Sequence, residues 1–319
     1  MLHQAIVIGI DVSKAGYDVH VLPSQAAFRA AAGAAQIAAL VRRLAALGPS
    51  AIALEASGGY ERPLARALHA AGLVVYILPP ARVRAFARAT GQAAKTDRID
   101  AAMIARFLAL AGEKLEPYAP DPDRDRLSAL IAHRRRLLAE QSGLESQLDT
   151  VTEPLVRRMI QARLRSIAAG ILLIGKTIRA RIAASPHLQA RFVRLTAVKG
   201  VGPVLAASLI ADMPELGRIS AKAAAALLGV APHARQSGAS NRPGRCQGGR
   251  KSLRDTLYMA TLSAVTARDP NLQPFYKRLR EKGKPFKTAL VAAMRKLITI
   301  LNAIARTDPA FQPEQTTVA

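Results

Sequence analysis

Two short apolar segments that each end in a carboxylate restrict the fold of this chain more than any other feature of its sequence. Residues 5–11 are dense in Ile and Val and end at Asp11, and residues 51–55 end at Glu55 in the same way. Because Ser and Gly follow each acid within a few residues, the pattern predicts two buried strands, each leading into a turn. A carboxylate beside a core strand is costly unless a cation or several donors compensate it. The two acids are therefore expected either to bind a metal ion or to cap turns.

Further strands and helices are expected to alternate with these two strands through residue 110. The expected strands cover 17–22 and 73–78, and the expected helices cover 34–47, the residues after 59, the residues from 80 to 89, and 95–110. Residues 17–22 alternate between apolar and polar side chains, which is typical of a half-exposed strand, and we expect this strand to pair with the first one in a hairpin. The alternation of strands with helices predicts an α/β domain, in which functional residues gather at the carboxyl ends of the strands.

The helix expected over residues 95–110 carries two acids near its start, Asp97 and Asp100. Asp97 has an ordinary structural explanation, since Thr96 or Asp97 can cap the helix and an acid in the first turn favours the helix dipole. Asp100 is not so easily explained. The spacing of three places both acids on one face of the helix, so both can reach one ion. Like charges this close repel each other unless a cation lies between them.

The four acids occur in three motifs, in the order Asp, Glu, Asp, Asp. The motifs are Ile8–Lys14 (IGIDVSK), Leu54–Tyr60 (LEASGGY) and Lys95–Ala101 (KTDRIDA). With these motifs the chain resembles the DEDD-type insertion-sequence transposases, the family that includes the Piv-type invertases and the bridge-RNA-guided recombinases. The resemblance implies a RuvC-like catalytic domain with the RNase H fold over residues 1–116. It also implies that the four acids hold Mg²⁺, two ions in all, with Mn²⁺ as an alternative metal.

The net charge of the chain points to a polyanionic partner. The 319 residues include 46 Lys and Arg against 22 Asp and Glu, which gives a formal net charge of +24 at pH 7. Nucleic acid is the expected partner of such a surface. An anionic membrane competes with it, but no apolar run reaches the ~18–20 residues of a spanning helix and no signal peptide precedes the first strand. We therefore expect a prokaryotic cytoplasmic, nucleoid-associated protein without a membrane partner. One cysteine, Cys246, and six scattered His provide neither an internal disulfide nor a zinc cluster.

Residues 117–122 contain three prolines and are expected to link the first domain to a helical region at 123–194. Apolar residues from Leu127 to Leu155 recur at alternating spacings of three and four, which is typical of a coiled-coil seam, and Pro154 is expected to kink or divide the helix. Two interpretations remain open: an intramolecular helical hairpin, and a coiled coil that joins subunits. The family resemblance implies a homo-oligomer, a dimer or a tetramer, and so favours the second interpretation.

The C-terminal domain, expected at residues 195–319, is predicted to be mainly helical and contains a Gly-rich turn at 198–203. This turn resembles a helix-hairpin-helix, in which backbone N–H groups at a helix start hold a phosphate. On this interpretation Lys199, Gly200 and Gly202 bind nucleic acid. A tight turn selected only for packing is the alternative.

Residues 233–250 have no hydrophobic periodicity and are predicted to form a long functional loop. Four arginines in it are expected to contact phosphate: Arg235, Arg242, Arg245 and Arg250. By its place after Gly229–Pro232, the segment Arg235–Gly238 matches the family motif that carries a nucleophilic serine, which implies that role for Ser237. Ser240 is the second choice. No His or Lys base is visible beside either hydroxyl, so the residues alone favour ordinary loop serines.

Taken with the resemblance, the sequence predicts a DNA recombinase that uses metal-assisted strand cleavage and a serine that holds the cut strand covalently. The resemblance implies donor and target DNA as partners, together with a structured noncoding RNA that pairs with both. Two other functions remain open. A junction-resolving nuclease would use the same four acids with water as the nucleophile, and a non-enzymatic basic binding protein would need neither the acids nor the serine.

Binding of nucleic acid should depend mainly on the part of the chain after residue 110. Residues 1–110 hold 12 Lys and Arg and 6 Asp and Glu, a net charge of +6, so +18 of the total +24 belongs to the remainder. Each Lys or Arg paired with a phosphate releases condensed counterions, so the DNA affinity of a 111–319 fragment should fall about tenfold or more between low and physiological salt. Fluorescence anisotropy with labelled DNA measures this change, and a salt-independent affinity contradicts the prediction.

Overall fold

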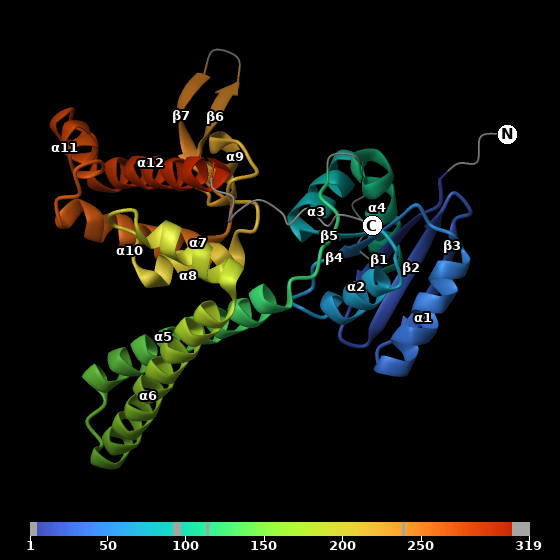
Figure 1. Cartoon of the computed structure of the whole chain (residues 1–319), viewed down its shortest axis with the longest axis horizontal. Coiled ribbons are helices and arrows are strands. Elements are labelled where there is room, and N and C mark those ends of the chain that lie inside the picture. The colour runs from blue at the N-terminus through green and yellow to red at the C-terminus, as the bar shows by residue number, and fades with distance from the viewer. Residues whose placement is uncertain (1–4, 92–96, 113–114, 238–239, 308–319) are drawn as a thin grey trace. The chain divides into compact units, whose positions relative to one another are not determined.

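The computed structural model describes residues 5–91, 97–112, 115–237 and 240–307, and within these ranges the side chains of residues 97–99 and 233–243 are not described. The chain divides into two compact units, residues 1–120 and residues 121–319 (Figure 1). The boundary between them falls within the proline-rich stretch 117–122.

The first unit is built on a five-stranded mixed sheet with the strand order β3-β2-β1-β4-β5. Its strands are β1 (Val7–Val12), β2 (Gly16–Leu22), β3 (Ala26–Ala31), β4 (Ala51–Glu55) and β5 (Val75–Leu78). β1 pairs antiparallel with β2 and parallel with β4, while β3 extends the antiparallel side and β5 the parallel side. The predicted hairpin of the first two strands is confirmed. β3 has no counterpart among the predicted strands, because its Ala-rich sequence shows little hydrophobic alternation.

Helices cover both faces of this sheet. On one face, α1 (Ala34–Ala46) and α2 (Glu61–Ala70) share a core cluster with β1, β2 and β4. On the other face, α3 (Pro80–Ala89) and α4 (Asp97–Ala111) form a second cluster with β1, β4 and β5. Six of the seven residues of β2 are buried, so the prediction of a half-exposed strand is wrong. The reason is that α4 also packs on β2 and covers the face that carries its polar residues.

The contact between α4 and β1 is close enough to require glycine. A Cβ atom at Gly9 would overlap the backbone of Ala101 and of Ala105 in α4. Any other residue at this position would push the helix away from the sheet, because close-packed interiors do not absorb an added methyl group without displacement. Gly9 therefore sets the distance between the helix and the strand.

The second unit is mainly helical. Its elements are α5 (Pro122–Thr150), α6 (Pro154–Ala184), α7 (Pro186–Thr196), α8 (Pro203–Asp212), α9 (Ala221–Leu227), β6 (Pro232–Ser237), β7 (Ser240–Cys246), α10 (Lys251–Thr266), α11 (Gln273–Glu281) and α12 (Phe286–Thr307). One core cluster extends from the start of α5 through α12. The elements outside the core are the far ends of α5 and α6 and the β6–β7 hairpin (Figure 1).

α5 and α6 lie side by side as a helical hairpin, one of the two arrangements that the seam allows (Figure 1). Pro154 is the first residue of α6, so it divides the predicted helix rather than kinking it. Buried Ile residues of α6 face α5, and a Cβ at Gly170 would lie 3.3 Å from Leu137 Cδ1, which shows how closely the two helices pack. A coiled coil between subunits through residues 123–194 stays a prediction.

The prediction of an irregular loop at 233–250 is wrong for most of its length, because residues 232–237 and 240–246 pair as the antiparallel strands β6 and β7. The reason lies in the composition of the two strands. Their residues are Arg, Ser, Gln, Asn, His, Pro and Gly, with one Ala and one Cys, so this ribbon has no hydrophobic face that periodicity could reveal.

Among the described residues, one helix, α12, is long and apolar enough by length and composition to cross a membrane. Nine of its residues are buried inside the second unit, and this core position accounts for its composition. Asn302 is one of them: its side chain accepts a hydrogen bond from the Gly217 N–H (2.9 Å) and donates one to the Ile219 carbonyl (2.8 Å). Arg295 and Lys296 interrupt the apolar run of this helix, so it does not stand out in the sequence as an unbroken apolar segment.

Gly9→Ala should destabilise the first unit by about 1–3 kcal/mol, the usual cost of overpacking a filled core. Gly143→Ala in α5 is the matched control, because a Cβ there meets nothing within 4 Å. Alanine at that helical position should stabilise the protein by about 0.5–1 kcal/mol. Urea denaturation followed by circular dichroism measures both changes. A Gly9→Ala protein as stable as the wild type contradicts the close contact.

Candidate active site

Asp11 and Glu55 lie level with each other on adjacent parallel strands. Ile10 of β1 pairs with Leu54 of β4, and each acid is the next residue of its strand. Neighbouring strands lie about 4.8 Å apart, and residues at equal positions in a parallel pair point to the same face of the sheet. Both carboxylates are partly buried. The two acids predicted to end the two strands are therefore neighbours in the fold, with Glu55 ending β4 and Asp11 one residue before the end of β1.

The face that carries these two acids is the face covered by α4. Along β1, Val7 belongs to the cluster of Met103, Ile104 and Leu108. Two residues later, Gly9 contacts Ala101 and Ala105, which lie earlier in the helix. α4 therefore runs in the opposite direction to β1.

This direction places the start of α4 at the end of β1 that carries Asp11. Asp97 begins the helix and Asp100 lies in its first turn, partly buried. The side chain of Asp97 is outside the described residues. The backbone positions of all four predicted acids thus gather at one end of the sheet.

The donor set suits a hard divalent cation, since Mg²⁺ and Mn²⁺ prefer carboxylate oxygens. Among the described side chains, which exclude that of Asp97, no group of three or more acidic, His or Cys residues is already arranged around one point. Asp11, Glu55 and Asp100 each have a polar or charged contact in the structure. The residue types and their position fit a metal site, and its ligand geometry involves a side chain that is not described.

The loop after β4 is held by Glu61, a buried acid at the start of α2 that the sequence analysis misses. One Glu61 carboxylate oxygen, Oε2, accepts hydrogen bonds from the Ser57 N–H (3.0 Å), the Ser57 hydroxyl (3.3 Å) and the Gly59 N–H (2.8 Å). Gly58 and Gly59 have φ of 73° and 110°, which glycine adopts without strain. The loop that follows Glu55 therefore has one defined conformation. The only sequence signal for this arrangement is an acid in the first turn of the helix, just after the Gly-Gly turn.

The Gly-rich turn of the second unit joins α7 to α8. Gly200 has φ 82°, and a Cβ there would lie 2.5 Å from the Cβ of Ala264, so packing alone accounts for this glycine. Gly202 caps α8 and faces open space, and Lys199 is exposed. A cavity of about 550 Å³ adjoins residues 196–202 and 263–270. Lys199 and Gly202 are exposed and Gly200 packs against Ala264, and the binding of a phosphate by this turn stays a prediction.

Ser237 and Ser240 occupy the tip of the β6–β7 hairpin. Ser237 is the last residue of β6, Ser240 is the first residue of β7, and the two pair across the ribbon. Two pairs further from the tip, Arg235 of β6 pairs with Arg242 of β7. The side chains of these four residues are outside those described. The backbone nevertheless places both serines at the end of a projecting element, with arginine positions next to them.

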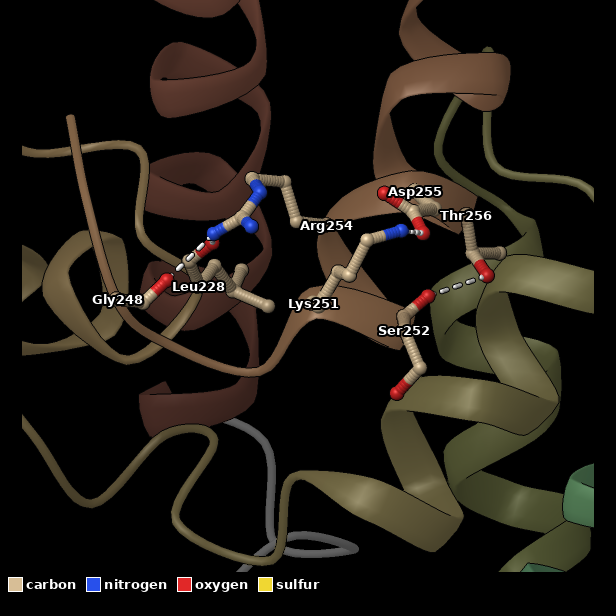
Figure 2. A network of polar contacts seen from close by, with 7 residues as sticks. All are labelled: Leu228, Gly248, Lys251, Ser252, Arg254, Asp255 and Thr256. Atoms are coloured by element: carbon tan, nitrogen blue, oxygen red, sulfur yellow. Dashed lines mark hydrogen bonds and ion pairs between the residues drawn. The ribbon is translucent and has the colours of Figure 1, made fainter. Parts of the chain in front are cut away.

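The base of the hairpin is fixed by a polar network (Figure 2). Arg254 donates hydrogen bonds to the carbonyls of Gly248 (2.5 Å) and Leu228 (3.3 Å), which ties the chain after β7 to the end of α9. On the same helix, the Lys251 ammonium contacts the Asp255 carboxylate at 2.6 Å. The Arg250 N–H also donates to the Leu227 carbonyl at 2.7 Å.

Arg250 is part of this base rather than of an open phosphate-binding surface. Its guanidinium donates two hydrogen bonds to the Glu215 carboxylate, at 2.7 Å and 2.5 Å. Burial alone would lower the pKa of Arg250, but the hydrogen bonds and charge of Glu215 raise it overall. Arg245, by contrast, is exposed. Of the four predicted phosphate-binding arginines, Arg250 is thus engaged by a carboxylate of its own unit.

These features define the class of protein to which the chain is similar. A mixed sheet with acids at one end and a mostly helical, basic region after it is compatible with a RuvC-like DEDD domain followed by a DNA-binding part. A family model described as a transposase, the DEDD transposase of IS110, matches residues 8–153, and a second, described as the IS116/IS110/IS902 transposase family, matches residues 193–277. The pilin gene-inverting proteins of Moraxella lacunata and Moraxella bovis are each 31% identical over 268 residues, which cover 81% of this chain and 80% of theirs.

The chain belongs to the IS110 family of transposases, which includes the Piv type. It is therefore a DNA recombination enzyme of an insertion sequence, and DNA is its partner. The DEDD domain also suggests that the enzyme uses a divalent metal ion.

Replacing Arg250 by alanine and replacing Arg245 by alanine should have different effects on stability and on DNA affinity. Arg250→Ala leaves Glu215 partly buried without its guanidinium, so the second unit should lose about 1–3 kcal/mol of stability. Arg245→Ala removes only an exposed charge, so stability should stay within about 0.5 kcal/mol of the wild type while DNA affinity falls. Thermal denaturation and anisotropy titrations distinguish the two. If both variants are equally stable, the Arg250–Glu215 pair does not hold the hairpin base.

Proposed function

We propose that this protein cuts and rejoins DNA strands by metal-assisted phosphoryl transfer in the first unit. The observation that carries the proposal is the convergence of Asp11, Glu55 and the start of α4 at one end of the sheet. Asp11, Glu55, Asp97 and Asp100 would hold Mg²⁺, two ions by the family pattern, with Mn²⁺ as an alternative. Metal ions bound there would stabilise the charge that develops on the leaving oxygen.

The proposed nucleophile is Ser237. Its hydroxyl oxygen attacks a DNA phosphorus, a phosphoserine ester forms, and one strand end leaves as a free hydroxyl that takes up the proton. Attack by a hydroxyl of another strand then reverses the chemistry and frees the serine, so no external energy source is needed. The support is the family motif at Arg235–Gly238 and the place of the serine at a hairpin tip beside arginine positions. Ser240, its partner across the hairpin, is the second candidate.

The proposed substrates are donor and target DNA, brought together by a structured noncoding RNA that pairs with both. The family resemblance supports the RNA, and the net charge of +18 after residue 110 supports contact with the backbones of both nucleic acids. The names of the two relatives describe inversion of a pilin gene, which is a cut-and-rejoin rearrangement. We propose the same type of reaction for this protein, but we do not propose that it acts on the same DNA target.

The proposed active form is a homo-oligomer, a dimer or a tetramer. The acids belong to the first unit and the serine to the second, and about 140 residues of mostly helical chain separate Asp97 from Ser237. We propose that the helices of residues 123–194 join subunits, so that the serine of one subunit acts with the acids of another.

Asp11→Asn and Asp100→Asn should each lower cleavage by orders of magnitude, because the amide keeps the size of the side chain and removes the charge that holds the cation. Folding should survive, since both residues are only partly buried. Gel assays of strand cleavage with Mg²⁺ present measure the loss. Normal cleavage by both variants contradicts the assignment of the site.

A mixture of Asp11→Asn and Ser237→Ala proteins tests the composite site. Each variant alone should be inactive, and mixed oligomers should regain cleavage if the acids and the serine come from different chains. A DNA–protein adduct that maps to Ser237 in the wild type supports covalent chemistry, and Ser240→Ala is the control that should keep it. Full cleavage by Ser237→Ala, with no adduct in the wild type, would instead indicate a resolvase-like enzyme with water as its nucleophile.

A further inference from the structure

The turn that joins α11 to α12 carries a dense group of positive charges (Figure 1). Between residues 277 and 287, six cations stand against one acid, Glu281, a net charge of +5 within eleven residues. A run of charge is often no more than a solvated surface, so the charge alone identifies no ligand. The six cations, all exposed, are Lys277, Arg278, Arg280, Lys282, Lys284 and Lys287.

Backbone hydrogen bonds hold this turn in one conformation. The Gly283 N–H donates to the Arg280 carbonyl at 2.9 Å, and the Lys284 N–H donates to the Leu279 carbonyl at 3.1 Å. This pair of bonds is typical of a helix that ends at a glycine. The Arg280 guanidinium also donates to the Lys284 carbonyl at 2.8 Å. The cations at the end of α11 are therefore held beside those at the start of α12.

An exposed aromatic ring lies within this group of cations. Phe286, the first residue of α12, is 41% exposed, and it is the only exposed phenylalanine among the described residues. Lys284 and Lys287 lie close to it in the chain. Its ring contacts that of Tyr276 in α11 edge to face, with the centroids 6.2 Å apart and the planes at 80°. Because such a contact covers at most one face of a ring, Tyr276 leaves a face of Phe286 uncovered.

A basic surface with an open aromatic face suits one class of ligand. Lys and Arg side chains pair with the phosphates of any nucleic acid. The bases of a duplex stack on one another and offer no face to a protein, whereas an unpaired base stacks on an aromatic side chain. The combination therefore favours a single strand over a duplex.

We propose that the α11–α12 turn is a binding site for single-stranded nucleic acid. An unpaired base stacks on Phe286, and Lys277, Lys284 and Lys287 pair with the phosphates on either side of it. The inference rests on the proposed function only in taking nucleic acid as the ligand, because neither the metal ions nor Ser237 takes part. Unpaired nucleotides of a structured RNA and those of an opened DNA strand share this chemistry.

The competing explanation is structural: Phe286 and Tyr276 only close the corner between the two helices, and the cations are only solvated. The two explanations predict different ligand preferences. A structural role makes the loss of Phe286 act through stability, with equal effects on single strands and duplexes. A stacking role makes it act on single strands alone.

Fluorescence anisotropy of the full-length protein tests this difference, with divalent metal removed so that no strand is cut. The probes are a short unstructured RNA, the DNA of the same sequence and its duplex. Phe286→Ala should lower the affinity for single strands about 5- to 100-fold and leave the affinity for the duplex unchanged. Phe286→Leu keeps an apolar side chain without a ring and should lose as much, whereas Phe286→Tyr should retain most of the affinity.

Leu110→Ala is the control, because this residue of the first unit is 76% exposed and its loss should change no affinity. The Lys277→Gln, Lys284→Gln, Lys287→Gln triple variant should lower the salt slope of single-strand binding by about two, since each phosphate contact contributes about 0.7. Phe286→Ala should leave that slope unchanged. A larger loss with RNA than with DNA assigns the site to an RNA, the reverse assigns it to an opened DNA strand, and equal losses support a site that accepts both.

Phe286→Trp gives a second, independent measurement. The chain contains no Trp, so this variant has a single indole, at the proposed stacking position. Single strands should quench its fluorescence, and the duplex should not. Thermal denaturation shows whether each variant is folded, and if Phe286→Ala is not, Phe286→Trp decides alone.

Three results overturn the inference. They are equal losses of single-strand and duplex affinity in folded Phe286→Ala, no loss in that variant, and no quenching of Phe286→Trp by single strands. Failure of the proposed function is a separate result, because it appears as normal cleavage by Asp11→Asn and Asp100→Asn and not in these affinities.

Discussion

The close contact between helix α4 and strand β1 at Gly9 determines where the acids of the candidate site lie. Because no side chain separates the two backbones at that point, the helix can cross the sheet near Asp11 with Asp97 and Asp100 in its first turn. The parallel pairing of β1 with β4 then adds Glu55 at the same level. The proposed metal site would be carried by a central strand pair and a packed helix, which suits chemistry that depends on exact charge placement.

The basic charge of the second unit has two different uses. Arg250 and Arg254 bond to Glu215 and to backbone carbonyls, so they fix the base of the β6–β7 hairpin. Arg245 is exposed and free of that framework. The net charge of +18 carried by residues 111–319 therefore overstates the number of groups that can neutralise phosphates, since part of the basic charge holds the structure that presents the rest.

The acids and the serine belong to separate units, which has a consequence for control of the reaction. By the proposed route a metal site without its nucleophile does not cut DNA, so the proposal makes activity depend on assembly of an oligomer with nucleic acid. The proposed nucleophile, Ser237, is the last residue of β6, in a polar hairpin whose base is fixed by the bonds of Arg254.

The sequence by itself determined the strands that bear Asp11 and Glu55 and the helices around them, and it marked Pro154 as the place where the long helix is kinked or divided. It also predicted the four acids as a set. These are local patterns, in which periodicity, β-branched runs and Gly or Pro placement act over a few residues. Only the tertiary structure decided the burial of β2, the strand character of β3 and of the β6–β7 ribbon, and the contacts of Glu61 and Arg250. Each of these depends on a partner distant in sequence or on backbone pairing without a hydrophobic face, and neither leaves a periodic trace in the chain.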